Sequence, residues 1–368
     1  MGLLKYNKVY VMAPYKYATG GVELAHQLVD YLREKGKEAY VFYISDIVSC
    51  KIVKDDNQVT EAYRKYNIAV ANSIDDSPEN VVVIPESFVM TIPYFKKAQL
   101  CIWWMSVENA LGWNGNFGDL WRHTQSVGQK MSMLKEVLKW MAKRTPLGPI
   151  VFKIKHKEFI KPKYPYPNNY SIEKVRQEDI RLYHFYQATY IQQYLYSQHF
   201  DRIFRLTDFI NPEILKNVDS SVKKENFILY NPAKGLKYTQ KLMKRMPRYK
   251  FIPLKGYTRE QLNHLFDQAK LYIDFGPFPG KDRLPREAAI HNCCIITGRF
   301  GASGYFEDIP INGKYKFDML HANYDDIKAR IDDVLDNYDD RIHDFKYMRE
   351  SIKHEQENFY REIDNIFI

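Results

Sequence analysis

The chain has 368 residues, of which 45% are hydrophobic and 27% are charged, and this composition is typical of a soluble globular protein with room for two α/β domains. No apolar run approaches the about 18 to 20 residues of a membrane span, and the N-terminus lacks a signal-peptide pattern, so we expect neither a membrane-spanning nor a secreted protein. The four cysteines show no metal-ligand spacing, which favours a reducing compartment.

The net charge of +9 is concentrated in one part of the chain. Between Arg122 and Lys163 there are eleven Lys or Arg residues and two Glu residues, a net of +9, so the remainder of the chain is near neutral. The basic character is therefore a local feature and not a property of the whole fold.

The first part of the chain has a β-α-β pattern. Lys8–Ala13 and Ala39–Tyr43 are predicted strands, and apolar residues recur at helical spacing over Val22–Leu32 between them. A right-handed parallel unit is therefore expected. Gly20 and Gly21 precede the helix and would let a ligand approach its N-terminus closely, although the full G-x-G-x-x-G pattern of a dinucleotide site is absent.

Three further strands are predicted before residue 112, at Ile68–Ala71, Val81–Ile84 and Leu100–Trp104. The second is followed by Glu86 and the third by Glu108. In open parallel sheets ligands bind beyond the carboxyl ends of the strands, so both carboxylates are candidates for a binding cleft. The alternative is that each glutamate only caps the helix that follows it.

From about residue 112 to residue 170 the alternation of strands and helices breaks, and we predict an insertion that contains a basic amphipathic helix. Its apolar face is formed by Met131, Leu134, Val137, Leu138 and Met141, and its basic face by Lys135, Lys139 and Lys143. Such a helix suits an anionic membrane surface. The alternatives are a helix packed on its own domain and, third, a nucleic-acid-binding element, for which the segment contains no known motif.

A second domain is predicted after a linker at Thr207–Pro212. Its strands are predicted at Phe227–Tyr230, Phe251–Leu254, Lys270–Phe275 and Cys294–Thr297. The first strand leads into Asn231–Gly235, and the second ends at Lys255 and Gly256. Thr258 and Gln261 have the spacing of a capping box, which predicts the start of a helix.

The stretch Phe275–Ala289, with the sequence FGPFPGKDRLPREAA, carries the strongest indication of a site. Glycines and prolines shape a strand-to-helix loop, and Pro285 stands where a first helical residue is favoured. Lys281 and Arg283 precede that helix start, where unpaired backbone N–H groups favour anionic oxygens, above all a diphosphate. Glu287 follows one turn later, where it can accept hydrogen bonds from hydroxyls. The alternative is a surface loop with solvated charges.

These features resemble the GT-B glycosyltransferases, in particular the GT4-type enzymes. Gly20–Glu23 looks like their early Gly-Gly turn, Asn231–Gly235 like their lysine-glycine loop, and Leu284–Ala289 like their Leu-Pro-x-x-Glu-Ala segment. The resemblance implies an α/β protein with two Rossmann-like β/α/β domains facing a central cleft, and a C-terminal helix that packs back on the first domain. It covers most of the chain but not about residues 112–170.

The resemblance also implies a donor site and an acceptor site. In the family the lysine matched by Lys234 binds the nucleotide diphosphate, and the glutamate matched by Glu287 contacts the donor. With the residue arguments above, the predicted donor-binding residues are Asn231, Lys234, Gly235, Gly256, Lys281, Arg283 and Glu287. The predicted acceptor-binding residues are Gly20, Gly21, Glu23 and Glu86.

Two positions depart from the family pattern and leave the stereochemistry open. Pro279 stands where the family often has an acid, and an arginine often found upstream of the lysine is absent, with Asn231 nearby; Arg283 could supply that charge. Fixed cations and helix N-termini can stabilise a leaving diphosphate without a metal, and the chain has no Asp-x-Asp triplet, so we expect metal-independent catalysis without a cofactor. An inverting reaction would need a carboxylate base, for which Glu108 is the candidate, whereas a retaining reaction would not.

The predicted function is hexose transfer from a UDP-, GDP- or dTDP-sugar to a glycan or lipid-linked acceptor in the synthesis of a surface polysaccharide, such as a capsule or an O-antigen. We expect a cytoplasmic protein that is peripheral on the inner face of the plasma membrane, binds its anionic surface and does not bind nucleic acid. The expected parts are an acceptor domain at 1–210, a donor domain at 211–345 and a returning helix at 346–368. The alternatives are a sugar-nucleotide epimerase of the same fold and a non-catalytic glycan-binding protein.

Overall fold

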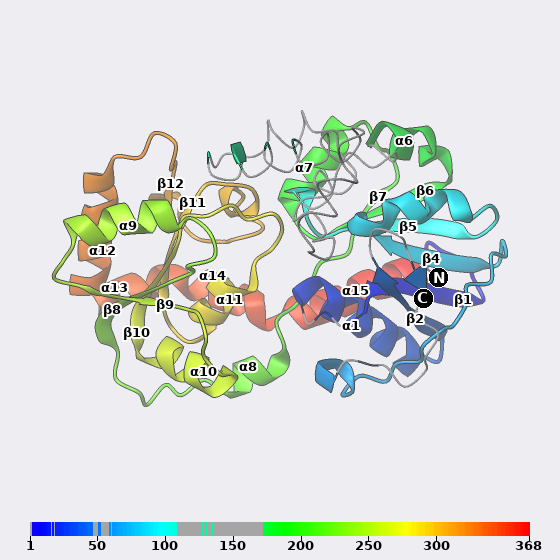
Figure 1. Cartoon of the computed structure of the whole chain (residues 1–368). Coiled ribbons are helices and arrows are strands. Elements are labelled where there is room, and N and C mark those ends of the chain that lie inside the picture. The colour runs from blue at the N-terminus through cyan, green and yellow to red at the C-terminus, as the bar shows by residue number, and fades with distance from the viewer. Residues whose placement is uncertain are drawn as a thin grey trace, which may run out of the picture. The chain divides into compact units, whose positions relative to one another are not determined.

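The computed structural model describes residues 2–15, 17, 19–46, 51–52, 59, 61–108 and 172–368, together with the single positions 127, 130, 131, 134 and 138. The chain divides into two compact units, each with a β-sheet flanked by helices (Figure 1). The N-terminal unit comprises Lys5–Phe185 and Leu195–Phe204, and the C-terminal unit comprises Met1–Leu4, Tyr186–Tyr194 and Arg205–Ile368.

Within the described residues, seven strands form the sheet of the N-terminal unit, in the order β3-β2-β1-β4-β5-β6-β7. They are β1 (Lys8–Pro14), β2 (Glu38–Asp46), β3 (Lys51–Ile52), β4 (Asn80–Pro85), β5 (Gln99–Trp104), β6 (Leu182–Tyr186) and β7 (Ile203–Arg205). Strand β1 pairs in parallel with β2 and β4, and β4 with β5, whereas the short β3 is antiparallel to β2. The central strands are buried along almost their whole length, which explains their continuous apolar runs.

The prediction of a strand at Ile68–Ala71 is wrong. This segment contributes only an isolated parallel bridge, between Val70 and Val41 of β2. All four of its residues are half-buried. A short apolar run that buries so little surface gains too little hydrophobic free energy to extend the pairing beyond one bridge.

Five strands form the sheet of the C-terminal unit, in the order β12-β11-β10-β8-β9, and every neighbouring pair is parallel. They are β8 (Glu225–Tyr230), β9 (Lys250–Pro253), β10 (Ala269–Asp274), β11 (Cys294–Gly298) and β12 (Lys316–Phe317). The four strands predicted in this part of the chain are therefore confirmed, with ends that differ by one or two residues.

The helices follow the strands as expected for β/α units. Helix α1 (Gly20–Glu34) joins β1 to β2; the others are α6 (Ile172–Gln177), α7 (Thr189–Ser197), α8 (Pro212–Lys216), α9 (Leu236–Arg245), α10 (Arg259–Gln268), α11 (Arg283–Ile290), α12 (Tyr324–Asp336), α13 (Tyr338–Arg341), α14 (Lys346–Lys353) and α15 (Glu355–Phe367). The predicted capping box at α10 is confirmed, because Thr258 and Gln261 exchange both side-chain-to-backbone hydrogen bonds.

Each sheet has one point at which the strand order reverses. In the N-terminal unit β2 and β3 are added on one side of β1 and β4 on the other, and in the C-terminal unit β9 and β10 are added on opposite sides of β8. In such sheets ligands bind beyond the carboxyl ends of the strands at the reversal. The loops after β1 and β4, and after β8 and β10, are therefore the places where a site is expected.

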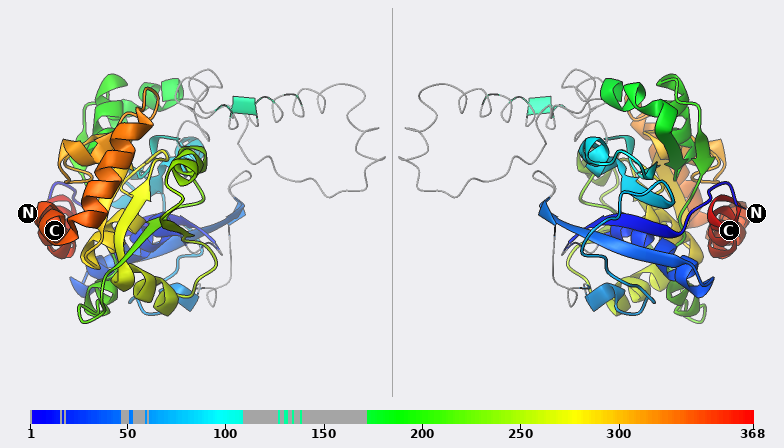
Figure 2. Two further views of the ribbon diagram at one scale, coloured as in Figure 1. Left: turned by 90° about the vertical axis from the view of Figure 1, so that its left-hand side faces the viewer. Right: turned by 90° about the vertical axis from the view of Figure 1, so that its right-hand side faces the viewer.

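The two ends of the chain lie side by side in the C-terminal unit (Figure 2). The backbone N–H groups of Leu3 and Leu4 donate to carbonyl oxygens of α15, at 3.0 and 2.9 Å. The carboxylate of Glu362, also on α15, accepts from the backbone N–H and the hydroxyl of Thr207, at 2.7 and 2.8 Å. The last helix thus packs on the first residues of the chain and on the segment around Thr207, which belong to the same unit as the helix itself.

The insertion at about 112–170 lies outside the described residues, apart from five single helical positions. Within the described ranges, no helix has both the length and the apolar character needed to cross a bilayer.

Candidate functional site

Two loops meet beyond the carboxyl ends of β8 and β10. One joins β8 to α9 through Asn231–Gly235, and the other joins β10 to α11 through Phe275–Asp282. Gly235 has a φ of 66°, and a Cβ on it would lie 2.4 Å from the backbone N of Gly276. A Cβ on Gly276 would in turn lie 2.5 Å from Cγ of Lys234. Two glycines therefore let the loops approach each other closely around Lys234.

The ammonium group of Lys234 is held at the reversal point of the C-terminal sheet. Its Nζ donates to the carbonyl oxygen of Pro277 at 2.9 Å, forms an ion pair with Asp282, and lies 3.6 Å from Oδ2 of Asp274. It also lies 3.8 Å from the centre of the Phe278 ring. Only 18% of the side chain is exposed, so the charge is fixed in place. A fixed cation at such an edge can stabilise an anionic oxygen with little reorganisation.

Asp274, at the end of β10, is a site residue that the sequence analysis missed. Its buried carboxylate accepts hydrogen bonds from the Tyr272 hydroxyl (3.1 Å), the Asn231 amide (3.3 Å) and the backbone N–H of Gly276 (3.0 Å). Burial raises the pKa of Asp274, and the charge of Lys234 opposes that rise. Asp274 thus connects both loops beneath Lys234, and the predicted donor residue Asn231 acts in this structure as part of that support.

Helix α11 begins at Arg283, which corrects the predicted start at Pro285. Pro285 is the third helical residue, still within the first turn, where its missing N–H leaves no hydrogen bond unmade. Asp282 stands at the N-cap position, but its side chain caps no backbone group and pairs with Lys234 instead. The side chain of Arg283 is half-buried in this first turn, next to backbone N–H groups of the helix start.

Glu287 is buried on α11 and forms an ion pair that the sequence did not predict. Its Oε2 lies 2.7 Å from Nη1 of Arg259, the first residue of α10. The Glu287 side chain is 5% exposed, whereas that of Arg259 is 50% exposed. Gly256, in the loop before α10, has a φ of 81°, which explains the glycine there. The loop after β9 thereby places a solvent-accessible guanidinium beside Glu287.

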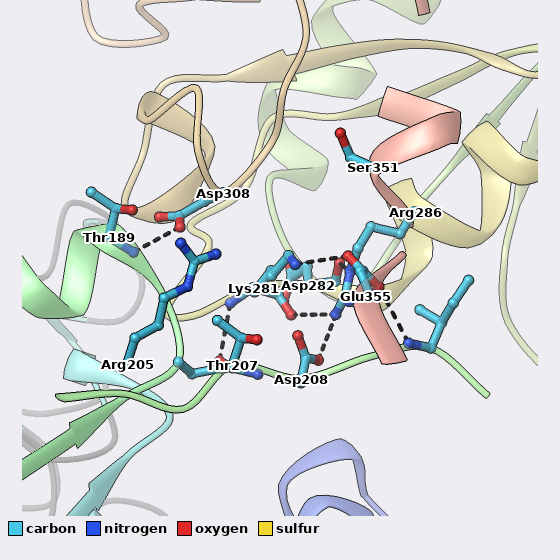
Figure 3. A network of polar contacts seen from close by, with 12 residues as sticks. Thr189, Arg205, Thr207, Asp208, Lys281, Asp282, Arg286, Asp308, Ser351 and Glu355 are labelled. Carbon is cyan, nitrogen blue, oxygen red and sulfur yellow. Dashed lines mark hydrogen bonds and ion pairs between the residues drawn. The ribbon is translucent and has the colours of Figure 1, made fainter. Parts of the chain in front are cut away.

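Lys281 belongs to a buried network of charges (Figure 3). Its Nζ lies 2.7 Å from Oε1 of Glu355, and Oε2 of the same carboxylate lies 2.8 Å from Nη1 of Arg286. Nη2 of Arg286 lies 2.6 Å from Oδ2 of Asp208. Burial alone would lower the pKa of Arg286, but Asp208 and Glu355 raise it above its ordinary value. The structure thus pairs Lys281 with a carboxylate of α15.

Arg286 also shapes the loop that carries the predicted phosphate-binding cations. Its Nε donates to the carbonyl oxygen of Asp282 at 3.0 Å, and its Nη2 donates to that of Lys281 at 3.1 Å. The guanidinium therefore fixes the backbone of the two residues that precede α11. Asp208 contributes from the segment that enters the C-terminal unit, so the network joins three stretches of sequence.

The predicted acceptor residues gather beyond β1, β4 and β5 in the N-terminal unit. Gly20 and Gly21 are the first two residues of α1, and a Cβ on Gly21 would lie 3.0 Å from Sδ of Met105. Glu86 begins the 3₁₀ helix η2 (Glu86–Tyr94), and its buried carboxylate accepts from the backbone N–H of Met105 at 3.1 Å. Glu86 therefore links the end of β4 to the end of β5 by a hydrogen bond. Glu108 follows β5 at the same edge of the sheet.

Glu23 and a tyrosine cluster lie on the same side of this sheet as the Gly20–Gly21 turn. Oε1 of Glu23 accepts from the Tyr66 hydroxyl at 2.8 Å and lies 3.5 Å from Nζ of Lys65. The carboxylate thus stands in the first turn of α1 with a phenol and an ammonium around it. Such an arrangement is able to bind hydroxyl groups.

His26, on α1, stabilises the Gly20–Gly21 turn through the residues that it contacts. The sequence analysis did not predict this role. It is fully buried, stacks on Tyr63 with ring centres 4.2 Å apart, and forms a 2.6 Å hydrogen bond with the Tyr43 hydroxyl. The Tyr63 hydroxyl donates to carbonyl oxygens in the loop before α1, of which that of Thr19 is at 3.2 Å. Burial lowers the pKa of His26 to about 4, so the imidazole is neutral near pH 7.

Among the described residues no cluster of His, Cys, Asp or Glu side chains has the arrangement of a metal site. The described cysteines are buried free thiols, and burial raises the pKa of Cys293 to about 11. A protonated, buried thiol is a poor nucleophile.

Comparisons with known proteins show the fold. No protein-family model matches the chain, and no curated protein sequence matches it. A sucrose-phosphate synthase from Thermosynechococcus elongatus superposes with a TM-score of 0.53 at 10% identity, over 97% of this chain and 97% of that one. The catalytic domain of starch synthase IV from Arabidopsis thaliana, bound to ADP and acarbose, superposes with a TM-score of 0.50 at 8% identity, over 98% and 100%.

TarM from S. aureus, in a complex with UDP, has a TM-score of 0.48 at 14% identity; the match covers 79% of this chain but only 56% of TarM. The two superpositions at 0.50 or above, with the two parallel sheets, show that the chain has the GT-B fold.

Proposed function

From the GT-B fold and the lysine fixed at the reversal point of its second sheet, we propose that this protein is a glycosyltransferase that uses a nucleotide-diphosphate sugar. The observation that carries the proposal is the position of Lys234, whose ammonium group is held by Asp274, Asp282 and Pro277 between two loops at the edge where α/β sheets bind ligands. The structural neighbours include a synthase with ADP bound, which is consistent with a nucleotide at such a site.

The proposed chemistry is stabilisation of the leaving diphosphate. As the bond between the sugar C1 and the phosphate oxygen lengthens, negative charge grows on the diphosphate. Lys234 supplies a positive charge when the diphosphate takes the place of its ion-pair partner Asp282, and the first backbone N–H groups of α9 and α11 point toward the same edge. We propose that these groups suffice and that no metal ion takes part.

The sugar is proposed to lie against Glu287. This carboxylate is held by Arg259 on one oxygen, which leaves its second oxygen for hydroxyls of the sugar or ribose. Arg259 is the better candidate than Lys281 for a further donor contact, because Lys281 is already paired with Glu355, whereas half of the Arg259 side chain is exposed. The acceptor is proposed to bind at Gly20, Gly21 and Glu23, with Glu108 as the base if the reaction inverts.

The acceptor is proposed to be a glycan or a lipid-linked oligosaccharide of a surface polysaccharide, reached from the inner face of the plasma membrane. Val127, Met131, Leu134 and Leu138 are helical, follow one another at the spacing of a single helix face, and are 37–70% exposed. An exposed apolar face within a segment of net charge +9 is typical of a helix that lies on an anionic bilayer. This supports peripheral membrane attachment.

The test begins with calorimetric titration of UDP, GDP and dTDP, followed by the sugar nucleotide of whichever base binds. We expect one diphosphate to bind and its hexose derivative to be consumed only when a glycan or lipid-linked acceptor is added. Turnover of the sugar nucleotide without an acceptor would identify an epimerase instead. Binding of glycans together with failure of every nucleotide to bind would contradict the proposal.

A further inference from the structure

A cavity of about 300 Å³ opens at the amino-terminal edge of the C-terminal sheet. Lys224, directly before β8, lines it together with His291 and Asn292, which lie between α11 and β11; Tyr338 and Arg349 complete the wall. The proposed donor site lies beyond the carboxyl ends of β8 and β10, so the cavity is at the opposite edge of the same sheet. Its volume is at the lower end of the range for small-molecule sites.

Lys224 brings a buried positive charge to this cavity, and the negative charge of Asp267 offsets the cost of its burial only in part. Its Nζ donates to the carbonyl oxygens of Phe266, Ala269 and His291 at 2.9, 3.0 and 2.5 Å, which uses all three protons. In the described part of the chain no carboxylate lies within ion-pair distance of it. Burial lowers the pKa of Lys224, which reflects the cost of holding this ammonium group away from water.

Arg349, on α14, is a second cation that forms no ion pair among the described residues, although the charge of the neighbouring Glu350 acts on it. Its Nη1 donates to the carbonyl oxygen of Ile342 at 3.1 Å, and among the described residues its other N–H groups have no hydrogen-bond partner and no carboxylate within ion-pair distance. Burial lowers the pKa of Arg349 as well. A partly buried guanidinium is costly unless an anion pairs with it, and its planar fork matches a phosphate or a carboxylate.

The two carboxylates nearest the cavity, Asp219 and Asp267, form hydrogen bonds with other groups. Asp219 accepts hydrogen bonds from the backbone N–H and the hydroxyl of Ser221, at 2.9 and 2.6 Å. Asp267, which lies behind His291, is engaged by the imidazole Nδ1 at 2.6 Å and by the backbone N–H of Asp219 at 3.2 Å. Neither carboxylate is within ion-pair distance of Arg349, so its guanidinium is available to an added anion, with the exposed imidazole of His343 at the cavity rim.

We propose that this cavity binds the anionic group, a phosphate or a carboxylate, of a small metabolite. Arg349 donates to two oxygens of the anion, and Lys224 contributes its charge from the floor of the cavity. The remaining volume accommodates the body of a molecule larger than inorganic phosphate. This site is separate from the diphosphate site and does not depend on the proposed transferase activity.

The experiment measures binding to the full chain by calorimetry at constant ionic strength, with inorganic phosphate, glycerol 3-phosphate and malonate as probes. We expect saturable binding that is at least about tenfold weaker in Arg349→Met and unchanged in Lys346→Met. The control removes the same charge from an exposed position on the same helix. Preference for the two phosphates or for malonate identifies the anionic group.

Two further variants keep the test decisive. Ser220→Glu places a carboxylate at the exposed rim without touching Arg349, and it should weaken anion binding even if Arg349→Met fails to fold. Lys234→Met, at the other edge of the sheet, should leave the site intact. The proposal is overturned if no probe saturates, if Arg349→Met and Lys346→Met lose affinity equally, or if only Lys234→Met abolishes binding.

Discussion

Replacing Lys234 with Met keeps the length of the side chain and removes its charge. Because the ammonium group is held in place and only 18% of the side chain is exposed, it should donate a charge-assisted hydrogen bond to a diphosphate oxygen that takes the place of the Asp282 carboxylate. Such bonds contribute about 1.5–3 kcal/mol. The dissociation constant of the nucleoside diphosphate should therefore rise about 10- to 150-fold.

The same substitution should change how the stability of the protein depends on pH. Burial already raises the pKa of Asp274, and Lys234 opposes that rise, so the pKa should increase further in Lys234→Met. A carboxyl whose pKa is higher in the folded than in the unfolded state contributes stability that is present at low pH and lost as the pH rises through the folded-state value. The melting temperature of the variant should therefore fall further below that of the wild type as the pH rises above the ordinary pKa of an aspartate, about 3.9.

The loss of stability should remain below the about 3–5 kcal/mol typical of breaking a fully buried ion pair. Asp274 keeps its hydrogen bonds from Tyr272, Asn231 and Gly276, and it can take up a proton. Calorimetry with the diphosphate and thermal unfolding at several pH values measure both effects, with Lys244→Met at the exposed far end of α9 as the charge-matched control. Equal affinity in Lys234→Met, Lys244→Met and the wild type would refute the assignment of the donor site.

Three other outcomes are expected. Glu287→Gln should lower the rate of glycosyl transfer at least about tenfold, equivalent to about 1.4 kcal/mol. Its melting temperature should be unchanged, because the amide oxygen still accepts a hydrogen bond from Arg259. Full activity of the variant would show that the negative charge of Glu287 is not needed. Burial lowers the pKa of His26 from 6.5 to about 4, so the free energy of unfolding should decrease by up to about 3 kcal/mol as the pH falls through that range. Urea unfolding of His26→Gln should show a weaker dependence of this free energy on pH. The same pH dependence in the variant and the wild type would contradict the lowered pKa of His26. The Arg122–Lys163 segment should bind anionic vesicles, and co-sedimentation with them should weaken as the salt concentration rises. Binding that is independent of both salt and anionic lipid would contradict membrane attachment through this segment.

The local features of the fold could be predicted because they depend on neighbouring residues. Strands such as β8 and β10 are continuous apolar runs that end at glycine-containing loops, and the α10 capping box is a spacing of three residues. The start of α11 was placed two residues late because proline is favoured in several positions of the first turn, and the sequence pattern does not distinguish the first from the third.

The partners of the charged residues could not be predicted, because they come from distant parts of the chain. Lys281 looked like a phosphate ligand in its own loop, yet its ammonium group pairs with Glu355 at the start of α15. Glu287 likewise pairs with Arg259 across two helices, and Asp274 lies 3.6 Å from the ammonium group of Lys234, which is 40 residues away in the sequence. Hydrophobic periodicity specifies which face of an element is buried, but not which charges meet there.

The charges around Arg286 constrain how this protein can change in evolution. Removing Asp208 or Glu355 alone would leave a fully buried guanidinium with an incomplete set of partners, whereas replacing the whole set with apolar residues of similar volume need not destabilise the protein. The effects of single substitutions at these positions should therefore be strongly non-additive. Among related sequences, Asp208, Lys281, Arg286 and Glu355 should be kept or lost together. Such joint variation would show that three segments evolve together: the one that enters the C-terminal unit, the loop before α11, and the last helix.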